Sequence, residues 1–182
     1  MKGALIKIAK ELNEKQILWA LGGSLVLKHY NLVGAPKDID IFVHEKDLDS
    51  VIKVMETMGE NTEVLGKGLY TTKYFYKYVV NNVNVDIMSG FGIRHEAGIF
   101  NYNFDETSIV DRIKYREVNI PLTSLEDWFV IYQLIPNRDE KVELIEQYFN
   151  SVGNVNKNVL GNYLEYNLPS KVKERIVSLI KE

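Results

Sequence analysis

Two carboxylates stand one residue apart in an otherwise apolar segment, Asp38-Ile39-Asp40-Ile41-Phe42-Val43. Acid and apolar side chains alternate at the period of a β-strand, so both acids point to one face and both isoleucines to the other. Aspartate is depleted from strands, and like charges packed side by side repel each other. A divalent cation, which prefers oxygen ligands, would offset that repulsion. The segment therefore predicts a strand with a metal site on its polar face.

The residues before this strand predict a site for phosphate. Residues 17–21 are apolar and predict a buried strand, and Gly22, Gly23 and Ser24 follow it directly. Glycine at the end of a strand lets the backbone approach a ligand closely. The helix predicted over residues 24–30 would offer N–H groups and the positive end of its dipole to an anion. Metal on one side and a phosphate cradle on the other indicate a nucleoside triphosphate site.

A third acid, Asp86, lies in another strand-like segment, residues 83–88. Asn81-Asn82 separates this segment from the aromatic-rich residues 69–80, and asparagine tolerates the left-handed conformation that tight turns require. The pattern predicts a hairpin. If its second strand lies beside residues 38–43, Asp86 reaches the same ions as the first two acids. The alternative is an aspartate that satisfies backbone amides at a strand end.

The remaining pattern predicts an α+β fold of mixed strands and helices. Residues 4–14 and 44–59 have helical spacing, and residues 98–121 contain further strand-like pieces that end at Pro121. From Thr123 onward the pattern is helical, with helices from Ser124 and over 138–149, 156–165 and 170–181. We expect a catalytic domain over residues 1–121 and a helical C-terminal subdomain over residues 122–182.

Composition narrows the class of protein. The 182 residues are 46% hydrophobic and 26% charged, which is ordinary for a soluble globular protein. A net charge of −3 gives no support for a duplex-binding protein. The absence of cysteine excludes disulfides and thiolate metal sites. No apolar run is long enough to span a bilayer, and lysine and glutamate interrupt the first residues, so we expect a cytoplasmic protein without a signal peptide.

Gly23-Ser24, Asp38-Ile39-Asp40-Ile41 and the later Asp86 together resemble the nucleotidyltransferase superfamily of DNA polymerase beta, over about residues 17–88. The resemblance implies a mixed β-sheet flanked by helices. It also implies that Gly23 and Ser24 hold the triphosphate of an NTP substrate, and that Asp38 and Asp40 bind two Mg²⁺ ions, with Mn²⁺ as a substitute. Asp86 would complete the metal site and can assist deprotonation of the acceptor hydroxyl.

Within that superfamily the short chain and helical tail look most like the lincosamide and aminoglycoside nucleotidyltransferases. The resemblance implies that an NMP moves from an NTP to a hydroxyl of a small acceptor and that pyrophosphate leaves. Gly22, Lys37, Arg138 and Lys141 are further candidates for contact with the triphosphate. The alternative is a solvated loop lysine at position 37 and an ordinary solvated helix face at 138 and 141.

Other interpretations stay open from the sequence. One is a non-catalytic nucleotide-binding or regulatory module, such as half of a toxin–antitoxin pair, and another is a nucleotidyltransferase toxin that acts on tRNA. A glycosyltransferase also uses Asp-x-Asp with a metal, but it would not explain the preceding glycines or the third acid. Gly90, Gly92 and Arg94 predict either a loop over the site or a plain connector. The aromatic run over 70–78 indicates sheet packing, with an acceptor groove as the alternative.

Overall fold

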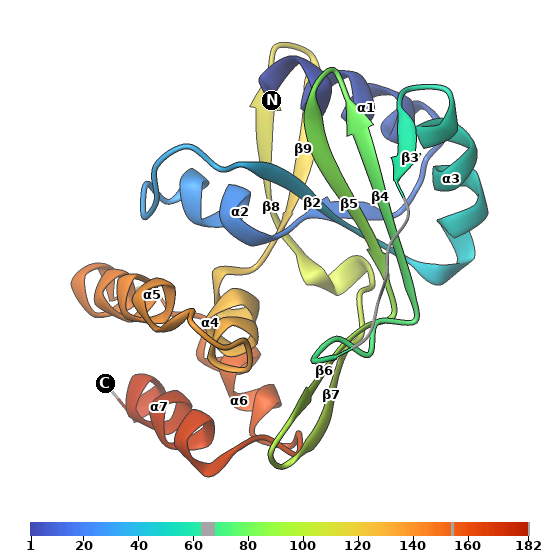
Figure 1. The fold of residues 1–182 in the computed structure, drawn as a ribbon. Coiled ribbons are helices and arrows are strands. Elements are labelled where there is room, and N and C mark those ends of the chain that lie inside the picture. Colours follow the sequence, from blue (N-terminus) through green and yellow to red (C-terminus); the bar gives the residue numbers. More distant parts are fainter. Residues whose placement is uncertain (63–67, 154, 182) are drawn as a thin grey trace. The chain divides into compact units, whose positions relative to one another are not determined.

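The computed structural model of the chain describes residues 1–62, 68–153 and 155–181 (Figure 1). Contacts between residues divide these into two compact units. The first unit contains the described residues of Met1–Gly66 together with Thr72–Phe91 and Tyr102–Ser124. The second contains the described residues of Lys67–Thr71 together with Gly92–Asn101 and Leu125–Glu182. The C-terminal helices therefore share their unit with two short segments from the strand-rich middle of the chain.

The described residues of the first unit form a seven-stranded mixed sheet in the order β3-β4-β5-β2-β1-β9-β8. β2 pairs in parallel with β5, and β1 pairs in parallel with β9, while the other neighbours are antiparallel. The strands are β1 (Trp19–Leu21), β2 (Asp38–Val43), β3 (Glu60–Thr62), β4 (Tyr74–Val80), β5 (Val83–Ser89), β8 (Ile109–Tyr115) and β9 (Val118–Thr123). The expected α+β class with a mixed sheet is confirmed.

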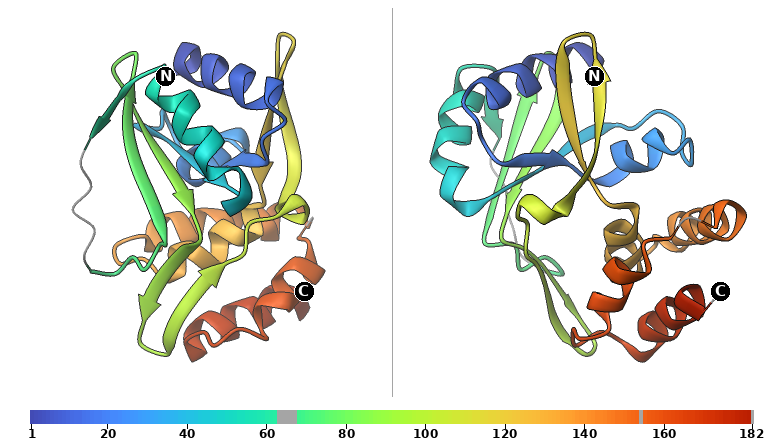
Figure 2. Two further views of the ribbon diagram at one scale, coloured as in Figure 1. Left: turned by 90° about the vertical axis from the view of Figure 1, so that its right-hand side faces the viewer. Right: turned by 180° about the vertical axis from the view of Figure 1, so that it is seen from behind.

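Two helices, α1 (Lys2–Glu14) and α3 (Leu48–Glu56), lie side by side against one face of this sheet (Figure 2). Their apolar residues recur at helical spacing, and Ile8, Leu12, Val51 and Met55 have no exposed surface. A third helix, α2 (Gly23–His29), follows β1 directly. The apolar stripes of α1 and α3 thus supply one half of the core, and the inward face of the sheet supplies the other.

The helix predicted over residues 44–59 begins as a 3₁₀ turn, η1 (Glu45–Asp47), before α3. The side chain of His44 accepts a hydrogen bond from the backbone N–H of Lys46 at 3.2 Å. Oδ2 of Asp47 accepts one from the N–H of Leu18 at 2.9 Å, which ties this turn to the start of β1. These two bonds hold the first turn in a tighter form than the α-helix that periodicity alone predicts.

The predicted Asn81-Asn82 hairpin is confirmed between β4 and β5. Both asparagines have positive φ angles, +51° and +59°, as a two-residue hairpin turn of this kind requires. The first strand is shorter than the pattern suggested, because Tyr70 instead forms an isolated bridge with Ile93.

Residues 90–94, expected as a loop or connector, instead contain most of a strand. β6 (Phe91–His95) pairs with β7 (Gly98–Tyr102) in a two-stranded ribbon, and η2 (Glu106–Ser108) follows. Phe91 and Ile93 alternate with exposed or small neighbours and are buried. Glycines at positions 90 and 92 are typical of loops, so the alternation of buried residues that marks a strand was not recognised.

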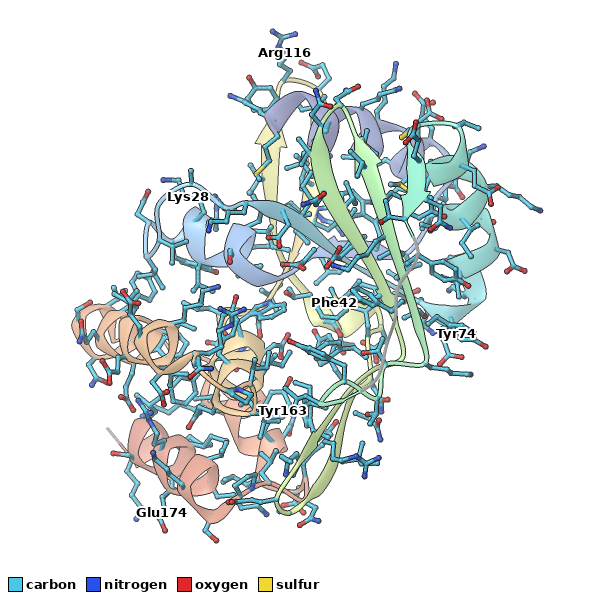
Figure 3. The ribbon with its side chains drawn as sticks, in the orientation of Figure 1. Lys28, Phe42, Tyr74, Arg116, Tyr163 and Glu174 are labelled. Carbon is cyan, nitrogen blue, oxygen red and sulfur yellow. The ribbon has the colours of Figure 1, made fainter. Side chains whose placement is uncertain are left out.

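Four helices belong to the second unit among the residues that the structure describes: α4 (Leu125–Gln133), α5 (Asp139–Val152), α6 (Lys157–Tyr163) and α7 (Ser170–Lys181). They match the four predicted helices within a few residues. α4 is the central one, since it is buried from Leu125 to Tyr132. The phenol of Tyr163, labelled in Figure 3, donates a 2.6 Å hydrogen bond to buried Asp127, which joins α6 to α4.

Across residues 1–62, 68–153 and 155–181, no helix has both the length and the apolar character needed to cross a membrane.

Candidate functional site

A row of polar residues crosses three neighbouring strands of the first unit. In the parallel pair β2–β5, Asp40 stands opposite Asp86, and in the antiparallel pair β4–β5, Asp86 stands opposite Lys77. Residues paired in this way project from the same face of a sheet, with adjacent side chains in reach of each other. Asp38 shares the face of Asp40, because it lies two residues before it, and it stands opposite Asn84. The three acids expected to act together therefore lie on one face.

The two faces of these strands differ sharply in burial. Ile39, Ile41, Val85 and Ile87 have no exposed surface and point into the core. On the other face Asp38 and Asp40 are half-buried, and the side chain of Asp86 is 14% exposed. The alternation of acid and isoleucine in the sequence produces this division, since successive side chains of a strand point to opposite faces. The carboxylates are thus held by a rigid apolar layer beneath them.

An aromatic cluster adjoins the acids on the same face. Phe42, two residues after Asp40 and labelled in Figure 3, is buried. Its ring lies 5.4 Å from that of Phe91 and 5.1 Å from that of Tyr102, measured between centroids. Tight packing of rings on this side fixes the end of β2, so the positions of the acids at its beginning are constrained by the backbone.

The pKa of the Asp86 carboxyl is shifted by its surroundings. Burial raises the pKa of this carboxyl above its ordinary value, and the nearby Asp38 carboxylate raises the pKa further. Lys77 acts in the opposite direction: its Nζ donates a hydrogen bond to Oδ2 of Asp86 at 3.3 Å. Because the upward effects dominate, the ionised form of Asp86 is costly here. An additional cation beside Asp86 would relieve that cost.

The glycine turn lies directly against Asp40. Gly22 donates its N–H to the carbonyl of Asp40 at 2.9 Å, which extends the row of residues across to the end of β1. Gly23 has a φ angle of +60°, and a Cβ atom at this position would lie 2.0 Å from Oδ2 of Asp40. Only glycine fits here, on both conformational and steric grounds. The half-buried Ser24 comes next, in the first turn of α2.

The donor set fits a hard divalent cation, because it consists of carboxylate oxygens. As the side chains are placed, however, no three His, Asp or Glu groups in the described parts of the chain are arranged to hold a metal ion. Lys77 supplies the positive charge at Asp86 instead. Asp40 and Asp86, which are adjacent in register, and Asp38 beside them are the residues that could hold an ion after their carboxylates turn toward one another.

The other predicted residues lie apart from this row or in the second unit. Lys37 immediately precedes β2 and is exposed. Arg138 is exposed at the N-cap of α5, and Lys141 donates from Nζ to the Tyr132 hydroxyl at 3.3 Å. Arg138 and Lys141 belong to the second unit, and their contact with a triphosphate stays a prediction.

Lys77 is the site residue that sequence reasoning missed. The signal was present, because a two-residue turn at Asn81-Asn82 fixes the register of the hairpin. Residues at equal distances from that turn face each other, and Lys77 and Asp86 are such a pair.

No protein-family model matches the chain, and no curated protein sequence matches it either. Solved structures do. A provisionally assigned nucleotidyltransferase from Thermotoga maritima is 21% identical to this chain and has a TM-score of 0.62. The matched region covers 82% of this chain and 92% of the Thermotoga protein. ANT(2")-Ia in complex with adenylyl-2"-tobramycin is 13% identical, covers 96% and 94%, and has a TM-score of 0.55. The lincosamide antibiotic adenylyltransferase LnuA, lincomycin-bound, is 13% identical, covers 80% and 96%, and has a TM-score of 0.52.

Each of these similarities extends over most of both chains. At such low identities the likeness concerns the fold. The chain therefore has the fold of the nucleotidyltransferases, as the glycine turn and the spaced acids led us to expect.

Proposed function

We propose that the chain is a nucleotidyltransferase that moves an NMP from an NTP to a hydroxyl group of a small acceptor, with release of pyrophosphate. The observation that carries the proposal is the row formed by Gly22, Asp40 and Asp86 on one face of the sheet, with Asp38 beside it. A glycine turn in contact with paired carboxylates would set an anion cradle next to a site for cations, which supports the proposal. The fold shared with nucleotidyltransferases supports the same assignment.

In this reaction the glycine end of the row and the Asp86 end would have different roles. The acceptor oxygen forms a bond to the α-phosphorus of the NTP, and the bond between that phosphorus and the bridging oxygen of the leaving pyrophosphate breaks. The electron pair of the broken bond departs with pyrophosphate. Gly22, Gly23 and Ser24 would hold the phosphates, and Asp86 would take the proton of the acceptor hydroxyl. Catalysis of this kind depends mainly on positioning and charge stabilisation.

Asp38, Asp40 and Asp86 would hold divalent cations, for which Mg²⁺ and Mn²⁺ suit the oxygen ligands. When bound, such ions neutralise phosphate charge and stabilise the attacking and leaving oxygens. Lys37 would be an additional contact to the triphosphate, and for Arg138 and Lys141 such a contact stays a prediction from the sequence. For the acceptor we propose the class that the similar structures display, a small hydroxylated molecule, since one of them contains adenylyl-2"-tobramycin and another contains lincomycin.

A second candidate is a module that binds a nucleotide but does not catalyse its transfer. The observation in its favour is the ion pair between Lys77 and Asp86, which places a lysine where the third acid would meet a cation. This module would bind an NTP through the glycine turn and release it unchanged.

Label transfer distinguishes the two candidates. The chain is incubated with α-³²P-labelled NTPs, Mg²⁺ or Mn²⁺, and separate pools of aminoglycosides, lincosamides, tRNA and a small-molecule cell extract. We expect label in a small-molecule pool and none after Asp40→Asn, because loss of one ligand disrupts the cation site. Asp49→Asn, which changes an exposed acid on α3, serves as the matched control and keeps full transfer. Label in no pool, with the chain folded, would refute transfer, whereas label on tRNA would assign a different acceptor.

A further inference from the structure

The order of residues along the row restricts where an acceptor can bind. The glycine turn contacts Asp40 on one side, Asp86 follows on β5, and Lys77 follows on β4. In phosphoryl transfer the attacking and leaving oxygens are roughly in line on opposite sides of phosphorus. If the pyrophosphate end of the NTP lies at the glycine turn, the acceptor must enter from the opposite side. That side is the surface of β4 beyond Asp86.

Two side chains of β4 dominate this surface. Lys77 is 44% exposed, and its Nζ lies 3.3 Å from Oδ2 of Asp86. Phe75 shares the face of Lys77, two residues earlier, and is half-buried, with its ring centroid 5.4 Å from the same Nζ. Thr62 of β3 stands opposite Lys77 and is exposed. A ligand that reaches Asp86 from β4 therefore meets a lysine ammonium and the open part of a phenyl ring.

The neighbouring charges that the described residues place near this surface are largely offset or screened. Lys73, two residues before Phe75, is paired with Glu45 at 2.5 Å, so the two charges offset each other. Glu60 stands opposite Val79 on the outer strand, one row farther along, and it is exposed to water that screens its charge. Asp86 itself is offset by Lys77. The ammonium of Lys77, 44% exposed and paired with Asp86, is therefore the charged group that a ligand arriving over β4 meets first among the described residues.

We propose that Lys77 and Phe75 select the acceptor, and that the acceptor is an uncharged or anionic hydroxyl compound with a flat apolar face. The proposal rests on the proposed function, because it takes the acceptor side from the direction of transfer. Phe75 packs against the flat face, and Lys77 attracts an anionic substituent and repels a cationic one. Polycationic aminoglycosides are disfavoured on this basis, although the fold is shared with an aminoglycoside-modifying enzyme.

The size of the expected preference follows from simple electrostatics. A unit charge about 4 Å from an isolated ammonium in water changes a binding constant by about five-fold. An anion and a cation at the same place would then differ by about twenty-five-fold, since one gains what the other loses. These figures are upper limits for Lys77, because the paired Asp86 carboxylate reduces its effect on a third charge.

Three matched benzyl alcohols test the preference: 4-(hydroxymethyl)benzoate as anion, 1,4-benzenedimethanol as neutral compound and 4-(hydroxymethyl)benzylamine as cation. Their dissociation constants are measured by ligand-observed NMR with Mg²⁺ and a non-hydrolysable ATP analogue present. We expect the anion to bind most tightly and the cation least. Lys77→Gln should bring the three constants together, and Lys77→Glu should reverse their order. Phe75→Leu should weaken all three and preserve the order.

Lys53→Gln, an exposed lysine on α3, is the control that leaves the order unchanged. Circular dichroism checks that each variant is folded. The proposal is overturned if the wild type binds the cation as tightly as the anion, if it binds none of the three, or if Lys77→Gln leaves the ratio unchanged. Label transfer to a cationic acceptor would refute this inference alone, whereas absence of transfer to any pool would refute the proposed function.

Discussion

Replacing Gly23 by alanine separates backbone strain from the contact with Asp40. A non-glycine residue at a φ angle of +60° costs about 1–2 kcal/mol, and the loss of freedom in the unfolded chain returns about 0.4–1 kcal/mol. The new Cβ would also lie 2.0 Å from Oδ2 and 2.8 Å from Cγ of Asp40. Relief of that overlap costs a further amount of about 1–3 kcal/mol. We therefore expect Gly23→Ala to lower the free energy of unfolding by about 3 kcal/mol.

Gly153→Ala is the matched control for this substitution. Gly153 ends α5 with a φ angle of +63°, and a Cβ there would meet nothing within 4 Å. It incurs the backbone cost alone, so its free energy of unfolding should fall by about 1 kcal/mol. Urea unfolding followed by circular dichroism measures both values.

Nucleotidyl transfer should respond even more strongly than stability. Displacement of the Asp40 carboxylate by about 1 Å should lower transfer about 100-fold in Gly23→Ala, whereas Gly153→Ala should keep wild-type transfer. The reasoning is refuted if the two variants lose equal stability, or if Gly23→Ala transfers as well as Gly153→Ala does.

Three further outcomes follow from the structure. Burial raises the pKa of Glu126 above 4.5, so the folded chain retains this proton longer than the unfolded chain, and stability falls as pH rises above that value. Glu126→Gln keeps an acceptor for the Asn156 N–H, and urea unfolding at pH 4.5 and 7 should show a smaller fall than in the wild type; an equal fall would contradict the assignment. Tyr163→Phe leaves buried Asp127 without its 2.6 Å donor, which should cost about 1–3 kcal/mol of unfolding free energy, and no loss would show the bond to be unimportant. Mg²⁺ with a non-hydrolysable ATP analogue at about 100 times its Kd should stabilise the chain by about 2.7 kcal/mol in thermal melts, and Asp40→Asn should abolish the gain; the same gain in both proteins would place the nucleotide elsewhere.

Local patterns in the sequence predicted the parts of the site that depend on local geometry. The alternation in residues 38–43 gave both the bounds of β2 and the separation of acids from isoleucines. Asn81-Asn82 predicted the turn between β4 and β5, because few residues adopt positive φ angles readily. Gly22 and Gly23 predicted a close approach of the backbone to a phosphate, which stays a prediction, and the structure adds that a Cβ atom at Gly23 would overlap Asp40.

Features that depend on pairing between distant segments were harder to predict. The sequence did not predict that β2 pairs with β5, since no local pattern specifies which strands become neighbours. The role of Asp86 was therefore made conditional on that pairing. β9 takes its place beside β1 from the far end of the unit, and nothing in residues 118–123 indicates this. The strand β6 was missed because Gly90 and Gly92 suggested a loop, whereas β7 lies within the residues 98–121 that were predicted to contain strand-like pieces. Lys77 was missed because its pairing with Asp86 becomes visible only when residues are counted outward from the Asn81-Asn82 turn.

Binding of Mn²⁺ tests the central assignment most directly, because its EPR signal weakens when the ion enters a protein site. The chain is titrated with Mn²⁺ in the presence of a non-hydrolysable ATP analogue, with Asp40→Asn and the exposed control Asp49→Asn in parallel. We expect wild type and Asp49→Asn to take up Mn²⁺ together with the nucleotide, and Asp40→Asn to lose that uptake. Equal uptake by Asp40→Asn, or none by the wild type beyond that of the nucleotide alone, would contradict a cation site at these acids.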